Sequence, residues 1–227
     1  MLPGIPPVLT GCAGPFSVLD PAGPAAATAA LLWWGMFGFF SLVFFAVCSL
    51  WLYAMFRTPP RTPDATQARR IQRRWLIGGG LVRPFAAVSV LLAFGIPAGH
   101  SMLPLPPDEG EALEIHVTAH QWRWDVRYPD GNISLANEIH IPAGRPVDVH
   151  LSSADVIHSF WVPRLGGKLD AVPGRTQVLR LQANEPGTYR GLCAEFCGLG
   201  HAHMHFTVIA HTPGAFDAWR VEAAGDD

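Results

Sequence analysis

Two long apolar stretches occupy the first half of the chain. No charged residue occurs from Ala25 to Phe56, and about 20 apolar helical residues are enough to cross a bilayer. A second run, from Trp75 to about Pro97, contains a single charge, Arg83, which is followed by Pro84. Membrane helices tolerate a proline when neighbouring helices compensate for it. The pattern therefore predicts two membrane-spanning helices, and it disfavours a buried helix of a soluble protein.

The segment between these stretches is basic. Residues 57–74 hold six arginines and one acid (Arg57, Arg61, Arg69, Arg70, Arg73 and Arg74, with Asp64). Short loops rich in Lys and Arg remain on the cytoplasmic side of a membrane. Residues 31–103 are therefore expected to form a two-helix anchor with a cytoplasmic loop at 57–74. Because the flanks are apolar, the loop is not interpreted as a nucleic-acid-binding segment.

The first 30 residues are expected to lie outside the cytoplasm. Leu9-Thr10-Gly11-Cys12 resembles the lipobox of bacterial lipoproteins, in which the cysteine becomes the lipidated first residue. Residues 1–8, however, lack Lys and Arg and are short for a signal peptide. Lipidation of Cys12 with removal of residues 1–11, and a chance match, are both open.

Beyond the proline-rich segment Leu103–Pro107 the pattern changes to alternation of apolar and polar residues. This alternation favours half-buried strands, and turn signals such as Pro173-Gly174 separate the segments. Short strands with regular turns predict an all-β sandwich or barrel in residues 108–227. A terminal helix is expected from Pro213 to Ala223. The predicted strands are Ala112–Thr118, Glu138–Ile141, Val147–Leu151, Val178–Leu181, Thr188–Leu192 and His203–Ile209.

Charge adds a hint about partners. Only 15% of the residues are charged, against roughly 25% in soluble domains, which agrees with a membrane protein. From Asp108 onward, sixteen acids and nine bases give a net charge of −7. A negative field accelerates encounter with a cationic partner, although solubility explains the same charge equally well.

The clearest chemical signal is a cluster of soft ligands in one short segment. Cys193, Cys197, His201 and Met204 follow the spacing C-x3-C-x3-H-x2-M. Thiolate, thioether and imidazole together suit copper that cycles between two oxidation states, whereas magnesium and calcium prefer oxygen. The segment joins two predicted strands, which would hold the ligands in a fixed geometry.

Other interpretations of this segment fit less well. Cysteines four residues apart in a tight loop suit a disulfide poorly, a structural zinc site usually has C-x2-C and no methionine, and a blue-copper site uses one cysteine. Two thiolates could bridge two metals, which requires one more imidazole. His158 lies upstream in an apolar run. Alone it would more often be structural, but beside the cysteine loop it becomes the candidate for that ligand.

The loop resembles the CuA loop of cytochrome c oxidase subunit II, written C-[SA]-E-x-C-G-x-x-H-x-x-M. Four further segments resemble other parts of the same family: His158–Pro163, Gly167–Asp170, Pro173–Arg175 and Gln121–Trp124. The similarity runs from about Leu31 to Trp219. The resemblance implies a transmembrane helical hairpin followed by a cupredoxin-like Greek-key sandwich or barrel.

The resemblance also implies roles for individual residues. Glu195 would give its backbone carbonyl to one copper and its carboxylate to a magnesium ion at the interface with subunit I. Trp122 would be the aromatic through which the electron enters, although a core tryptophan is an open alternative. Asp155 would be an acidic docking position. The five side-chain ligands of the two coppers would be His158, Cys193, Cys197, His201 and Met204.

The implied function is electron transfer in a bacterial inner membrane, with the C-terminal domain in the periplasm. Electrons from cytochrome c would reach the binuclear CuA centre and then haem in subunit I, where oxygen is reduced and protons are translocated. The haems and CuB would lie in subunit I only. The expected partners are subunit I, the other oxidase subunits, cytochrome c and membrane lipid, without nucleic acid.

Three departures and three alternatives accompany this resemblance. Arg123 stands where the family commonly has an aromatic residue, and Arg127 follows it. No acid occurs between Asp64 and Asp108, which puts the family's proton-entry role in doubt for this chain. No C-x-x-C-H haem-attachment motif occurs. The alternatives are a quinol oxidase subunit, which would typically have lost the copper ligands, the CuA domain of a nitrous oxide reductase, and a copper-binding assembly protein.

Overall fold

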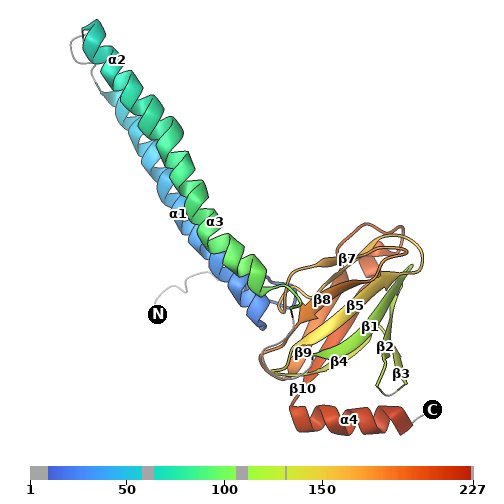
Figure 1. The fold of residues 1–227 in the computed structure, drawn as a ribbon. Helices are drawn as coiled ribbons and strands as arrows, with labels where there is room; N and C mark the ends of the chain where they lie inside the picture. Colours follow the sequence, from blue (N-terminus) through green and yellow to red (C-terminus); the bar gives the residue numbers. More distant parts are fainter. Residues whose placement is uncertain (1–9, 58–63, 106–111, 131, 226–227) are drawn as a thin grey trace, which may run out of the picture. The chain divides into compact units, whose positions relative to one another are not determined.

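The computed structural model describes residues 10–57, 64–105, 112–130 and 132–225. The chain divides into two compact units, and each is described by itself. One unit is Leu31–Ser101, and the other combines Met1–Ala30 with Met102–Asp227. Figure 1 shows the first as helices and the second as a β domain with the C-terminal helix α4.

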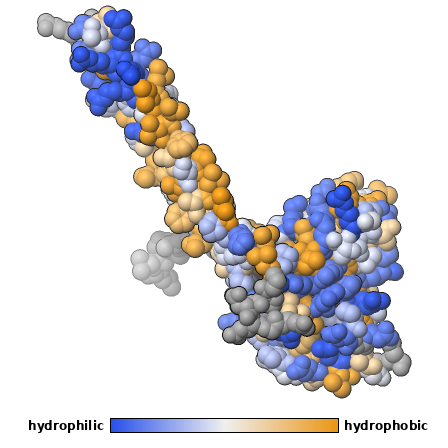
Figure 2. All heavy atoms as spheres, viewed as in Figure 1, coloured by the Kyte–Doolittle hydropathy of each residue, from blue (hydrophilic) through white to orange (hydrophobic). Residues whose placement is uncertain are grey.

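The helical unit contains two helices that are long and apolar enough to cross a membrane. The helix α1 spans Pro24–Phe56, and a second continuous helix runs from Ala65 to Ser101. The second consists of α2 (Ala65–Arg74), a π-helix (Trp75–Val82) and α3 (Arg83–Ser101). Apolar side chains cover much of this unit in Figure 2. The prediction of two apolar helices is confirmed.

The second helix begins earlier than the sequence analysis expected. Residues 65–74 belong to the predicted loop, yet they form α2, because Asp64 provides an N-cap. Its carboxylate accepts hydrogen bonds from the backbone amides of Thr66 and Gln67, each at 2.8 Å. Arginine and glutamine also favour helix. Of the predicted loop, residues 58–63 lie outside the described residues.

The β domain is a sandwich of two five-stranded sheets. Within each sheet one pair of neighbours is parallel, β1 with β5 and β4 with β10, and the other pairs are antiparallel. The first sheet has the order β3-β2-β1-β5-β8, with β1 Leu113–His120, β2 Arg123–Tyr128, β3 Ile133–Ala136, β5 Val147–Ser153 and β8 Gln177–Leu181. The second has the order β4-β10-β9-β6-β7, with β4 Glu138–Pro142, β6 His158–Trp161, β7 Leu169–Ala171, β9 Gly187–Cys193 and β10 His205–His211.

A single aromatic-rich core joins the two sheets. Trp124 is fully buried and meets Phe160 and Phe206 at ring-centroid distances of 5.5 and 5.4 Å. Along β1, buried and more exposed residues alternate from Leu113 to His120, as the period-two pattern predicted. The predicted all-β sandwich is confirmed, but β2, β3, β6 and β7 were not among the predicted strands.

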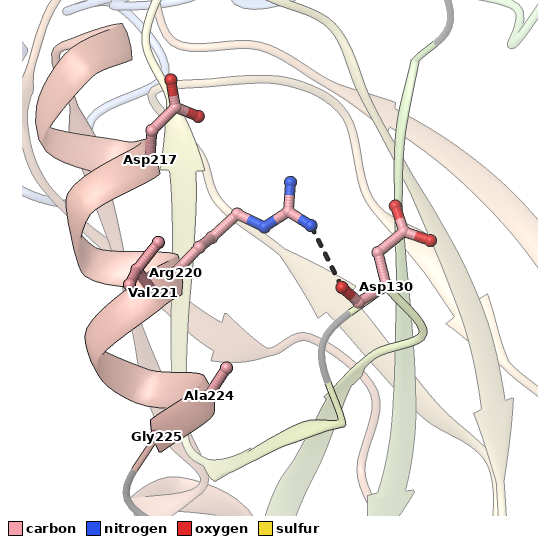
Figure 3. Close-up of a pocket in the computed structure, with 6 residues that line it drawn as sticks. All are labelled: Asp130, Asp217, Arg220, Val221, Ala224 and Gly225. Atoms are coloured by element: carbon pink, nitrogen blue, oxygen red, sulfur yellow. Dashed lines mark hydrogen bonds between the residues drawn. The ribbon is translucent and has the colours of Figure 1, made fainter.

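The C-terminal part of this domain consists of the strand β10 and a helix that contacts the loop after β2. The predicted strand 203–209 begins only at His205, because His201–His203 forms a turn of 3-10 helix. The predicted C-terminal helix is present as α4 (Pro213–Gly225), and its Arg220 donates a hydrogen bond to the carbonyl of Asp130 at 3.2 Å (Figure 3). This contact ties the helix to the end of β2.

The segment that precedes the first membrane helix also belongs to the β domain. Asp20 pairs with Arg164 at 3.1 Å, and the amide of Ala22 donates to the Arg164 carbonyl at 2.7 Å. A Cβ at Gly23 would lie 2.6 Å from the carbonyl oxygen of Leu165, so only glycine permits this close approach. The chain is therefore fixed to the sandwich immediately before α1 begins.

Candidate metal centre

The ligand-bearing loop leaves β9 and returns into β10, and backbone hydrogen bonds fix both of its ends. The Cys193 amide donates to the Met204 carbonyl at 2.9 Å, and the Ala194 amide donates to the Ser159 carbonyl at 2.9 Å. The second bond ties the loop to β6, on which His158 lies. Residues 35 positions apart in sequence therefore meet at one end of the second sheet.

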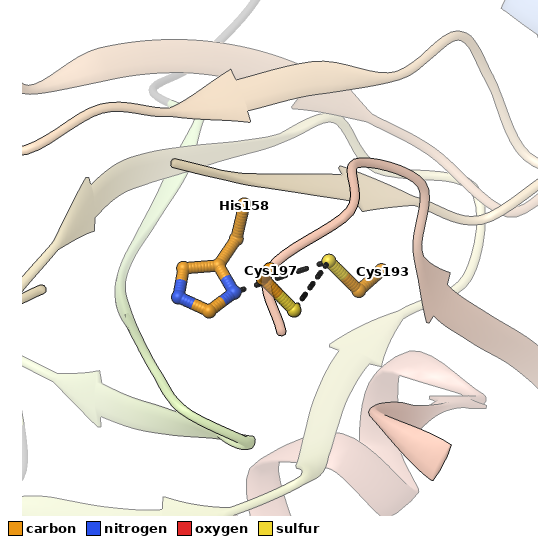
Figure 4. Close-up of side chains that lie close together, drawn as sticks. All are labelled: His158, Cys193 and Cys197. Atoms are coloured by element: carbon orange, nitrogen blue, oxygen red, sulfur yellow. Dashed lines mark hydrogen bonds between the residues drawn. The ribbon is translucent and has the colours of Figure 1, made fainter. Parts of the chain in front are cut away.

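The five predicted side-chain ligands converge there. The Cys193 Sγ lies 3.9 Å from the His158 Nδ1 and 3.8 Å from the Cys197 Sγ (Figure 4). The Cys197 Sγ in turn lies 3.6 Å from the His201 Nδ1 and 3.8 Å from the Met204 Sδ. The Glu195 carbonyl oxygen is 3.2 Å from the Cys193 Sγ. The structure thus assembles every donor that the sequence analysis named for copper.

The arrangement fits a metal better than a disulfide or a plain core. Both cysteines are free, and 3.8 Å between the sulfurs is far beyond the roughly 2.05 Å of a disulfide. A metal ion bound to both sulfurs through bonds of about 2.3 Å can bridge the 3.8 Å between them. Burial, together with the neighbouring Cys193, raises the pKa of Cys197 to about 11. Metal binding must therefore displace a proton from this thiol.

Asp155 positions the ring of His158, the candidate histidine ligand. Its carboxylate oxygen lies 2.8 Å from the His158 Nε2, which leaves Nδ1 facing Cys193. Burial alone would raise the pKa of Asp155, but hydrogen bonds from His158 and from the amides of Val156 and Gln121 lower it to about 2. An ionised carboxylate behind a ligating imidazole fixes the ring and increases its basicity. The sequence analysis missed this role, although the D-x-x-H spacing could have indicated it.

Trp122 lies on the outside of the loop. Its indole Nε1 donates to the Cys197 carbonyl at 3.3 Å, and the Gln121 side chain donates to the same oxygen at 2.7 Å. A Cβ at Gly200 would lie 2.6 Å from the Trp122 Cγ, so the ring rests directly on the loop backbone. The side chain is 41% exposed. The core-tryptophan alternative is therefore wrong for Trp122; the tryptophan in the core is Trp124.

Comparison with known proteins determines the family. The family model described as cytochrome c oxidase subunit II, periplasmic domain, matches residues 131–211. A cytochrome c oxidase subunit 2 from Alkalihalophilus pseudofirmus is 35% identical over 226 residues, which cover 93% of this chain and 64% of that protein. A quinol oxidase subunit 2 from Bacillus cereus is 33% identical over 219 residues, covering 93% of this chain and 74% of that protein. The chain belongs to the cytochrome c oxidase subunit II family.

This subunit II chain thus spans 64% of the length of its Alkalihalophilus relative. Among solved structures, the periplasmic domain of subunit II of cytochrome oxidase from Bradyrhizobium japonicum has a TM-score of 0.48 and 32% identity, covering 50% of this chain and 95% of that one. The family confirms the predicted fold class, two apolar helices followed by a cupredoxin-like domain. It also makes the chain a membrane protein with an extracytoplasmic domain.

Five apolar side chains are exposed on the candidate ligand loop and in nearby segments, and we call them the apolar rim. Phe196 and Leu199, on the ligand loop itself, are 76% and 97% exposed. Val156, Ile157 and Trp122 add further exposed apolar surface from the neighbouring segments. Large apolar side chains exposed in this number are available for contact with another protein. Sequence reasoning missed this rim, because nothing in the pattern distinguishes an exposed loop phenylalanine from a core one.

Glu195 occupies the position that the resemblance assigned to magnesium. Its side chain is exposed. Within the described residues it joins no group of three side chains that could hold a metal ion.

Proposed function

We propose that this chain carries a binuclear copper centre, CuA, through which electrons pass from cytochrome c to haem in subunit I of a haem-copper oxidase. The observation that supports the proposal is the donor set: two thiols, two imidazoles, a thioether and a backbone carbonyl form one continuous group in which neighbouring donor atoms lie 3.2–3.9 Å apart. Bound there, copper would supply a one-electron carrier.

The protein residues hold that centre rigid and largely dry. Cys193, Cys197, His158 and Met204 are buried. The strands β6 and β9 fix the backbones of His158 and Cys193, and a hydrogen bond from the Cys193 amide holds the Met204 carbonyl. The Asp155 carboxylate holds the His158 ring in one orientation. When the ligands keep their positions as the metal changes oxidation state, the reorganisation energy of electron transfer stays low.

Cytochrome c would dock on the apolar rim. Trp122 is both half-exposed and hydrogen-bonded to the carbonyl of a ligand residue, so it would connect the docked donor to the centre. Asp155 combines a low pKa with partial exposure, so it could also face a cationic donor, in addition to orienting His158. The net charge of −7 from Asp108 onward would attract that partner.

The remaining assignments complete the proposal. Residues 57–74 would face the cytoplasm of a bacterial inner membrane, and residues 108–227 would lie in the periplasm. Subunit I would supply the haems, CuB, the oxygen-reducing site and proton translocation, and Glu195 would share a magnesium ion with it. Membrane lipid would surround α1 and the helix Ala65–Ser101.

A quinol oxidase subunit is the second candidate, because several relatives carry that name. Two measurements separate the candidates. Electron paramagnetic resonance of the copper-loaded chain should show one electron shared by two copper nuclei, and the purified oxidase should oxidise reduced cytochrome c. His201→Gln should abolish the signal, whereas the matched control His203→Gln, on an exposed neighbour in the same turn, should retain it. A single-copper signal, or oxidation of quinol without oxidation of cytochrome c, would contradict the proposal.

A further inference from the structure

A second group of metal-ligating side chains lies on the first sheet, away from the copper ligands. Glu114 and His116 are two residues apart on β1, so their side chains point to the same face. On the neighbouring strand β5, His150 lies directly opposite His116 in the parallel register. Figure 1 shows these two strands in the middle of the domain. The alternation of burial along β1 and β5 places all three on the outer, solvent-facing side of the sheet.

The three side chains are already close enough to share an ion. One ligand atom from each lies within 4.8 Å of the others. The Glu114 carboxylate oxygen is 2.7 Å from the His116 Nε2 and 3.7 Å from the His150 Nε2. The two imidazole rings stack with centroids 5.2 Å apart and an angle of 11° between their planes. Two in-register strands therefore present two imidazoles and one carboxylate as a preformed set.

Neighbouring charges leave this set available. Asp148, opposite Glu114 on β5, is held by the Arg180 guanidinium through two hydrogen bonds of 2.8 Å. That ion pair satisfies Asp148, so the Glu114 carboxylate is the acid turned towards the imidazoles. Arg127 lies opposite His116 on β2 and is exposed. Its positive charge would repel a bound cation, so removing that charge should strengthen metal binding.

We propose that Glu114, His116 and His150 form a surface site for a divalent transition-metal ion of the zinc type. Two imidazole nitrogens and one carboxylate oxygen are the protein ligands of many zinc sites, in which water takes the fourth position. Imidazole donors exclude magnesium and calcium, which require oxygen ligands. The same donors would bind Cu²⁺ more tightly than Zn²⁺. None of the three residues belongs to the copper centre, so the two sites load independently.

The test is zinc binding by the full chain in detergent, without a polyhistidine tag. A Cys193→Ser/Cys197→Ser variant removes the thiols that would otherwise bind zinc. This variant should bind one Zn²⁺ that is lost, or weakened by at least about tenfold, when His116→Gln or His150→Gln is added. Glu114→Gln should weaken binding less than the histidine substitutions, and Arg127→Gln should strengthen it.

His120→Gln is the matched control, because His120 lies on the same strand and face as His116 and also pairs with a carboxylate, Asp125, at 3.0 Å. It should leave zinc affinity unchanged. If the cysteine variant fails to fold, the starting protein is instead the wild-type chain that has been loaded with copper and then treated with a chelator to remove copper from exposed sites. The proposal is overturned if the starting protein binds no zinc, or if His120→Gln weakens zinc binding as much as His116→Gln. Glu114 and His116 would then form only an ion pair, with the His150 ring stacked beside it.

Discussion

The contact between Trp122 and the ligand loop gives the sharpest prediction, made by changing Gly200 to alanine. The Gly200 backbone has φ −88° and ψ 3°, which alanine can adopt without left-handed strain. The new Cβ would lie 2.6 Å from Cγ and 2.7 Å from Cε3 of the Trp122 ring. Comfortable carbon–carbon contacts begin at about 3.5 Å. The ring must therefore retreat from the loop by about 1 Å, which stretches its 3.3 Å hydrogen bond to the Cys197 carbonyl.

Two effects should follow from this displacement. Overpacking of this kind costs about 1–3 kcal/mol, and Trp122 can relieve part of it because one side of the ring faces solvent, so the loss of stability should fall at the lower end. Electron transfer from reduced cytochrome c should slow, because the contact between the half-exposed ring and the ligand loop is broken. The copper spectrum should remain, because Gly200 provides no ligand.

The assay is stopped-flow oxidation of reduced cytochrome c by the assembled oxidase, together with thermal unfolding and paramagnetic resonance. Gly214→Ala in α4, where an added Cβ meets nothing within 4 Å, is the matched control and should behave as wild type. In a Trp122→Leu background, Gly200→Ala should cause no further slowing. An unchanged oxidation rate in Gly200→Ala, with the copper spectrum intact, would refute the role of Trp122.

Three further predictions test the orientation of a ligand, the core and the docking of α4. Asp155→Asn should lower copper affinity by about 10–100-fold, because His158 loses its charged partner; an unchanged copper titration would contradict the orienting role. Phe206→Ala should cost about 3–5 kcal/mol in the free energy of unfolding measured with denaturant, because the ring is buried against Trp124; a loss near zero would refute the assignment of this core. Burial, with His140 in contact, lowers the pKa of His211, so the folded state favours the neutral ring. The resulting contribution to folding stability is present above the unfolded pKa of about 6.5 and is lost as pH falls through the lower folded pKa. His211→Asn should therefore make the melting temperature fall less steeply as pH is lowered.

Alternation of apolar and polar residue types predicted six of the ten strands in the described residues, although it left out β2, whose positions also alternate between buried and more exposed. It identified β1, β4, β5, β8, β9 and β10 with small errors at the ends. The strand β6 was not predicted because its sequence does not alternate: two polar residues, His158 and Ser159, are followed by two aromatic ones. The strand β7 is three residues long, too short to produce a period. Strands of these two kinds are defined by their neighbours rather than by their own sequence.

The grouping of the five candidate ligands was predictable from the sequence, because four of them lie within twelve residues; that they bind copper stays a prediction. The surroundings of the centre were not predictable. The hydrogen bond from the Gln121 side chain to Cys197 joins residues 76 positions apart, and the rim of exposed apolar side chains depends on which way each loop residue points. Such long-range features arise only when the sheets have packed.

The burial of the two cysteine sulfurs also bears on how copper arrives. An ion in solution cannot reach thiols that are 3% exposed while the loop between β9 and β10 stays closed; the half-exposed His201 is the donor that such an ion meets first. Uptake then requires an opening of the loop, so at high copper concentration the loading rate reaches a plateau set by that opening. The same closed loop would also slow the loss of a bound metal.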